Sequence, residues 1–138
     1  MKREHVIIVH DLEQATIALN AAKDCQRALT LRSAPEAAAY LSAAVFKAMI
    51  ENAATAVPEA DYEAALDCGD QPGLVMNALR QGIKMVRANL NDELYTKMVS
   101  IAEQAGAIVQ PYDEIPVLDL RHISDPAAAC RDWLERTE

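Results

Sequence analysis

The sequence predicts a single α/β domain: a five-stranded, mainly parallel sheet between helices, of the flavodoxin-like or doubly wound kind. Three observations predict it. Short apolar runs alternate strictly with helical stretches, the connections are short, and N-cap residues follow the runs. Such alternation favours right-handed crossovers between parallel strands, with helices on both faces of the sheet. The chain, residues 1–138, suits one domain with one core.

The first two strands and the helix between them are clearly marked. The β-branched run 5–10 reads as a strand buried on both faces. D-L-E-Q follows as a capping box with Asp11 as N-cap, and helical spacing continues to about Lys23. A second strand, residues 28–32, ends at Ser33.

The next helix is predicted over Pro35–Thr55, with Ser33 as N-cap and Glu36 as its capping-box partner. This stretch is apolar nearly all the way round, which is typical of a helix buried on more than one side. We therefore expect a homo-oligomer, most simply a homodimer, through this helix. The alternative is that its alanines are tolerated in solvent.

The remaining elements continue the alternation. We expect strands at 62–67, 83–89 and 107–110, helices at about 71–81 and 92–105, a short extra edge strand at 117–120 and a C-terminal helix. Asn91 is the expected N-cap of the second of these helices, and Ser124 or Asp125 that of the last, which begins at Pro126.

Charge and composition exclude several partners. The formal net charge is −8 and the basic residues are scattered, which disfavours nucleic-acid binding. The longest apolar stretch, 37–50, is interrupted by Ser42 and Lys47, so no membrane span is expected. The apolar run near the N-terminus is too short for a signal peptide, and three cysteines without a C-x-x-C pair suit reduced thiols. We expect a cytoplasmic protein.

The fold class indicates where a site would lie, because ligands of open parallel sheets bind beyond the carboxyl ends of the strands. The residues expected there as ligand-binding candidates are Asp11, Arg32, Ser33, Asp70 and Asn89. Arg32 is the one positive side chain predicted at this edge, and helix N-termini there would add N–H donors for a small anion. The first hypothesis is therefore a binding or regulatory domain for a small anionic ligand.

The loop D-C-G-D-Q-P-G, residues 67–73, has two interpretations. As a strand-to-helix turn, it uses Gly69 for positive φ and Asp70 as a helix cap. As a site, it offers Asp67 to a metal or a proton. Cys68 is a poor nucleophile, because two flanking carboxylates disfavour its thiolate. The glycine spacing matches no phosphate-binding loop.

The element order and chain size resemble those of response-regulator receiver domains, and Asp67 lies where that family keeps its phosphoacceptor. Asp11 matches one of the two acids that the family places after its first strand, but His10 stands where the other belongs. Asn89 replaces the hydroxyl residue that ends the fourth strand, and none of the five lysines follows the fifth. We therefore do not assign the chain to this family.

Catalysis is the second hypothesis. His10 and Asp67 are the candidate acid or base, since imidazole titrates near neutrality and both residues end strands. A cation held by Asp11 and Asp67 is a variant of this hypothesis. The three histidines have no zinc-ligand spacing, and no cofactor is indicated. A third hypothesis is an interaction module without a ligand.

Overall fold

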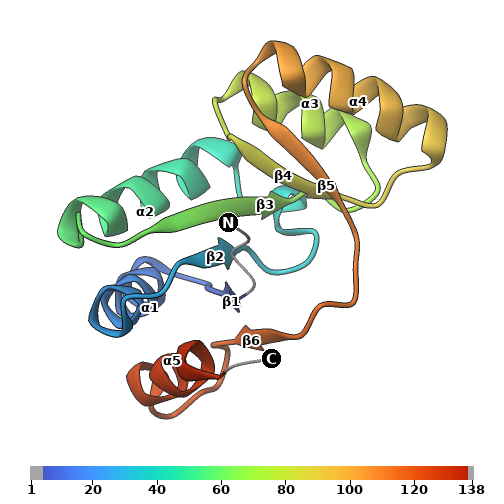
Figure 1. Cartoon of the computed structure of the whole chain (residues 1–138). Helices are drawn as coiled ribbons and strands as arrows, with labels where there is room; N and C mark the ends of the chain where they lie inside the picture. Colours follow the sequence, from blue (N-terminus) through green and yellow to red (C-terminus); the bar gives the residue numbers. More distant parts are fainter. Residues whose placement is uncertain (1–4, 137–138) are drawn as a thin grey trace. The chain divides into compact units, whose positions relative to one another are not determined.

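The computed structural model describes residues 5–136 (Figure 1). It divides into two compact units. Among the described residues, the first takes 5–32, 49–63 and 116–136, and the second takes 33–48 and 64–115. The chain passes between the units four times, so neither is a continuous stretch of sequence. That residues 1–138 form one domain stays a prediction, and each unit is described below by itself.

The predicted fold class is confirmed. The strands are β1 (Val6–Ile8), β2 (Leu29–Arg32), β3 (Tyr62–Asp67), β4 (Met85–Ala88), β5 (Ile108–Pro111) and β6 (Val117–Asp119). Their hydrogen-bonded order is β5-β4-β3-β2-β1-β6, and β1–β2, β1–β6, β3–β4 and β4–β5 all pair in parallel. Within the described residues the sheet has six strands, one more than the five expected, and β6 is the extra edge strand.

The helices alternate with the strands as expected. They are α1 (Leu12–Cys25), α2 (Ala43–Ala56), α3 (Pro72–Arg80), α4 (Asp92–Gln104) and α5 (Pro126–Glu135), with a short 3-10 helix, η1, at Ala37–Ala39. None of the helices between residues 5 and 136 is long and apolar enough to cross a membrane.

In the first unit, β1 lies between β2 and β6, and Ile8 is in register with Arg32 on one side and Asp119 on the other. Ile7 and Leu31 are completely buried. Helices α1 and α5 pack against each other. The strands that flank β1 come from distant parts of the sequence, so the strand order reverses here. The carboxyl end of β1 is therefore where a ligand site is expected.

In the second unit, β4 lies between β3 and β5, and α3 contacts α4. Leu66 and Val86 are in register on neighbouring strands and are completely buried. The next register pair is Asp67 and Arg87, two charged side chains at the carboxyl ends of β3 and β4. Their burial requires compensating polar contacts.

The predicted helix over Pro35–Thr55 is wrong at its start. The chain makes η1 first, and α2 begins only at Ala43. Ser42 caps α2, because its Oγ accepts the N–H of Val45 at 3.1 Å. Glu36 has a φ of 59°, in the left-handed region that interrupts a right-handed helix. The cause is tertiary: the backbone N–H of Glu36 is directed at Asp67 Oδ1, at 3.1 Å.

Burial on α2 follows a single stripe at helical spacing: Ala43, Phe46, Ile50, Ala53 and Val57, the last just beyond the helix. On the opposite side Ala44, Val45 and Ala48 are exposed. In a single chain this exposure fits both alternatives stated above, a subunit interface and alanines tolerated in solvent. Oligomerisation through the helix stays a prediction.

Local capping signals were otherwise reliable. Asp11 Oδ1 accepts the N–H of Gln14 at 2.8 Å, and Asn91 Oδ1 accepts that of Leu94 at 2.9 Å. Asp125, rather than Ser124, caps α5. The exception is α3. Its N-cap is Gln71, which makes no side-chain capping bond, so the predicted Asp70 cap is wrong.

Candidate functional site

A histidine–aspartate pair lies at the carboxyl ends of β1 and β6 in the first unit. His10 Nε2 is 2.6 Å from Asp119 Oδ1. Asp119 is in register with Ile8, and His10 follows Ile8 by two residues, so the two side chains lie on the same face of the sheet. The His10 side chain is 19% exposed and that of Asp119 44%, so a small molecule can reach the pair.

Local hydrogen bonds hold both partners in place. The backbone N–H of His10 donates to Gln14 Oε1 at 2.8 Å, which ties the strand end to the first turn of α1. The N–H of Arg121 donates to Asp119 Oδ1 at 2.9 Å. Asp11, predicted as a ligand-binding residue, uses Oδ1 to cap α1.

The contacts of this pair define the charge of Asp119 and the tautomer of His10. Burial by itself raises the pKa of the Asp119 carboxyl. The hydrogen bonds from the Arg121 N–H and from His10, with the charges of these two residues, outweigh that effect and hold the pKa below its usual range. An ionised carboxylate only accepts hydrogen bonds, so Nε2 of His10 carries the proton. The other ring nitrogen, Nδ1, then carries the lone pair.

Arg32 is a further polar residue on this face. It is in register with Ile8 on β2 and is 6% exposed. Arg32, His10 and Asp119 therefore come from three neighbouring strands at one end of the sheet in the first unit. Of the predicted ligand-binding residues, Asp11 and Arg32 belong to this unit, whereas Ser33, Asp70 and Asn89 belong to the second.

The lowered pKa of Asp119 predicts a pH dependence. Its pKa is lower in the folded than in the unfolded state, so the ionised carboxylate stabilises the fold above the unfolded pKa of about 3.9. That stabilisation is lost as pH falls through the folded pKa. The pair is partly exposed, so we expect Asp119→Asn to cost less than about 1 kcal/mol at neutral pH. In urea titrations the difference from wild type should shrink below about pH 4. A difference that stays constant into more acidic solution would contradict this.

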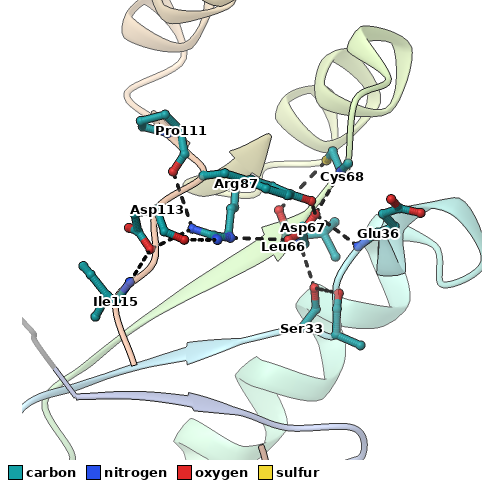
Figure 2. A network of polar contacts seen from close by, with 12 residues as sticks. Ser33, Glu36, Leu66, Asp67, Cys68, Arg87, Pro111, Asp113 and Ile115 are labelled. Carbon is teal, nitrogen blue, oxygen red and sulfur yellow. Dashed lines mark hydrogen bonds and ion pairs between the residues drawn. The ribbon is translucent and has the colours of Figure 1, made fainter. Parts of the chain in front are cut away.

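A second polar cluster, in the second unit, is centred on Asp67 (Figure 2). Asp67 Oδ1 accepts hydrogen bonds from the N–H of Glu36 at 3.1 Å, the N–H of Gly69 at 2.9 Å and the hydroxyl of Tyr112 at 2.7 Å. Its own N–H donates to Ser33 Oγ at 2.9 Å. Asp67 thus joins three loops that follow β2, β3 and β5.

Arg87 completes this cluster from β4 (Figure 2). Its Nε lies 3.5 Å from Asp67 Oδ2, and its Nη1 donates at 3.4 Å to both Pro111 O and Asp113 Oδ1. The guanidinium stacks over the Tyr112 ring, 4.4 Å from the centroid. The prediction that Arg32 is the one positive side chain at the strand ends is therefore wrong. Arg87 was missed, although an arginine within an apolar strand sequence is itself a signal of a paired buried charge.

Asp67 is a structural centre in this arrangement. It is 2% exposed, and both carboxylate oxygens are already in contact with donors. Neither a metal nor a phosphoryl group can reach it without displacing them. No group of three or more His, Cys, Asp or Glu side chains in residues 5–136 could hold a metal ion. Asp70 and Asn89 are exposed, and the N–H of Asn89 donates to Gly69 O at 2.8 Å.

Two of the three cysteines are buried in the folded protein. Cys68 is completely buried, and its burial, together with the charge of Asp67, raises the pKa of the thiol to about 12. Burial raises the pKa of Cys130 to about 11. Only Cys25 is partly exposed. We expect a thiol reagent at pH 8 to label Cys25 alone at first, and the other two only as fast as the protein opens. Prompt labelling of Cys68 in native protein, read by peptide mass mapping, would contradict this.

One open hollow of about 390 Å³ lies in the first unit, lined by Ala22, Lys23, Gln26, Arg27, Ala28, Glu59 and Asp61. It adjoins the start of β2, at the opposite end of that strand from Arg32. Its charged side chains are of mixed sign, and Lys23, Glu59 and Asp61 are exposed. It therefore does not coincide with the histidine–aspartate pair.

The chain matches no protein-family model, and no curated protein has a significantly similar sequence.

Proposed function

We propose that this protein binds a small molecule at the carboxyl ends of β1, β2 and β6 and moves a proton on it through His10. The observation that carries the proposal is the 2.6 Å contact between His10 Nε2 and Asp119 Oδ1 where the strand order reverses. Asp119, which was not among the candidates from the sequence, is the carboxylate next to the histidine.

The pair has the parts that general acid–base catalysis requires. The carboxylate fixes the tautomer of His10 and stabilises the imidazolium that forms when Nδ1 accepts a proton. The same nitrogen can return that proton to another atom of the ligand, so an isomerisation or an exchange reaction needs no further reactant. A positioned acid or base of this kind contributes roughly 10²- to 10⁴-fold to a rate.

A second candidate function is binding without chemistry, by a regulatory domain for a small anion. The observation behind it is the position of Arg32, a buried guanidinium in register with Ile8 at the same end of the sheet as His10. Guanidinium recognises carboxylates and phosphates through paired hydrogen bonds. In this case no bond to hydrogen is broken at His10.

The test has two stages. A panel of carboxylates, phosphorylated metabolites and nucleotides is first screened for thermal stabilisation, since a ligand at 100 times its Kd adds about 2.7 kcal/mol. Each compound that binds is then incubated in D₂O and followed by NMR for deuterium incorporation. The variants are His10→Gln and Asp119→Asn. His122→Asn is the matched control, because His122 has a φ of 63° that asparagine tolerates.

The outcomes separate the two functions. Incorporation that falls at least about 100-fold in His10→Gln but not in His122→Asn supports catalysis. Binding that is lost in Arg32→Gln, with no incorporation in any variant, supports the regulatory domain instead. If no compound stabilises the protein, both candidates fail and an interaction module becomes the better hypothesis.

The homo-oligomer expected from the sequence has a direct test. Val45 is 54% exposed on α2. If α2 forms a subunit interface, Val45→Glu places a charge there and should reduce the particle to the monomer mass. Light scattering coupled to size-exclusion chromatography gives the mass, with Asn52→Glu on the same helix as the control. A wild-type monomer would contradict the prediction outright.

A further inference from the structure

The segment 111–115, which begins at the last residue of β5 in the second unit, lies over the Asp67–Arg87 pair, and none of its side chains is buried. All five of its residues are exposed. Its two large side chains, Tyr112 and Ile115, are 37% and 47% exposed. The pair beneath is buried, at 2% and 7%. We call these five residues the cover segment.

Polar contacts hold the cover segment in place. The shortest runs from the Tyr112 hydroxyl to Asp67 Oδ1, at 2.7 Å. Arg87 contributes three more, to Pro111 O, Asp113 Oδ1 and Asp113 O, each at 3.4 Å. Strong arginine–carboxylate contacts are about 2.7–2.9 Å, so the hydrogen bonds of Arg87 are weaker than that of the Tyr112 hydroxyl. The guanidinium also stacks over the Tyr112 ring, 4.4 Å from the centroid, a contact that phenylalanine at this position would keep.

A segment held in this way opens at low cost. Regions with few buried apolar contacts and exposed backbone occupy the low end of local stability in proteins. Asp67 would keep the N–H donors of Glu36 and Gly69 after the cover segment left, and Arg87 would keep its contact with Asp67. The pair beneath therefore stays compensated in the open form, which makes that form accessible.

We propose that residues 111–115 form a movable cover over the Asp67–Arg87 pair and that the Tyr112 hydroxyl is its latch. Opening exposes the guanidinium of Arg87 and releases its Nη1 and Nη2 from the cover segment. Burial, the hydrogen bond to Asp67 and the charge of Asp67 raise the pKa of Tyr112 above its usual value. The hydroxyl therefore stays protonated, and the latch is intact at neutral pH.

The cover segment carries its own cleavage site, because a Glu-specific protease cuts after Glu114 and requires the chain to open locally. The rate of cleavage there thus measures the open population when opening is fast. We compare full-length wild type with Tyr112→Phe, which removes the latch hydroxyl alone. Tyr95→Phe is the matched control, since the Tyr95 hydroxyl donates to Val109 O on β5 and not to the cover segment. Cleavage after Glu103, on α4, reports opening elsewhere in the unit.

Tyr112→Phe should raise cleavage after Glu114 roughly tenfold, as expected for loss of a hydrogen bond to a charged group. Cleavage after Glu103 should be unchanged, and Tyr95→Phe should match wild type at Glu114. Unchanged cleavage at Glu114 overturns the proposal, because the Tyr112 hydroxyl then does not hold the cover segment. An equal increase at both sites also overturns it, because the hydroxyl then stabilises the whole unit. Should Tyr112→Phe not fold, Asp113→Asn weakens the Arg87 contacts of the same segment and must show the same selective increase.

Discussion

Replacing Asp67 with asparagine is expected to lower the free energy of unfolding by about 3–5 kcal/mol, the range for removing one partner of a buried ion pair. The shape is nearly unchanged, but the negative charge that faces Arg87 Nε at 3.5 Å is lost. Arg87, 7% exposed, then keeps only its contacts with the cover segment. Asparagine also presents one oxygen instead of two to the donors around this position.

Urea denaturation of purified protein measures this change. Asp70→Asn is the control, because it makes the same substitution three residues away, at an exposed turn position. It should change stability by no more than about 0.5 kcal/mol. Equal effects of the two substitutions would mean that Asp67 is not the centre of the polar cluster.

Replacing Phe46 with alanine should cost about 3–5 kcal/mol, the usual range for a buried aromatic truncation. Phe46 is 1% exposed and belongs to the buried stripe of α2. It is also the only phenylalanine of the chain, so no neighbouring aromatic of that kind can fill the space. The truncation removes apolar burial and leaves a cavity lined by side chains that relax only in part.

The control for Phe46→Ala is Asn52→Ala, at an exposed position of the same helix. It should be neutral within about 0.5 kcal/mol. A loss below about 1 kcal/mol for Phe46→Ala would contradict the assignment of a single buried stripe to α2.

The two polar clusters have different consequences for function. In the Asp67 cluster each carboxylate oxygen is already in contact with donors. We therefore expect substitutions there to change mainly the stability of the fold. The His10 and Asp119 side chains are partly exposed, and Nδ1 of His10 is not used in the contact between them. We therefore expect substitutions of this pair to change ligand binding more than stability. Stability measurements on Asp67→Asn and ligand experiments on His10→Gln therefore address separate properties of the protein.

The sequence by itself determined the features that depend on neighbouring residues. The alternation of apolar runs and helical stretches predicted the α/β class, because the spacing of apolar residues along a helix or strand reflects which of its faces is buried. Caps such as Asp11 and Asn91 were predicted because a capping side chain binds an N–H three residues away. The strand ends were predicted well enough to nominate His10 and Arg32.

Only the tertiary structure decided the features that depend on residues far apart in the chain. Ser33 and Glu36 resemble a capping box, but Asp67, more than thirty residues later, binds both and turns Glu36 into the left-handed region. His10 likewise finds its carboxylate in Asp119, 109 residues away, rather than in Asp11 beside it. A local pattern carries no information on which strand will lie alongside. Which strands become neighbours depends on the packing of the whole core. The partners of His10 and Asp67 follow from that packing.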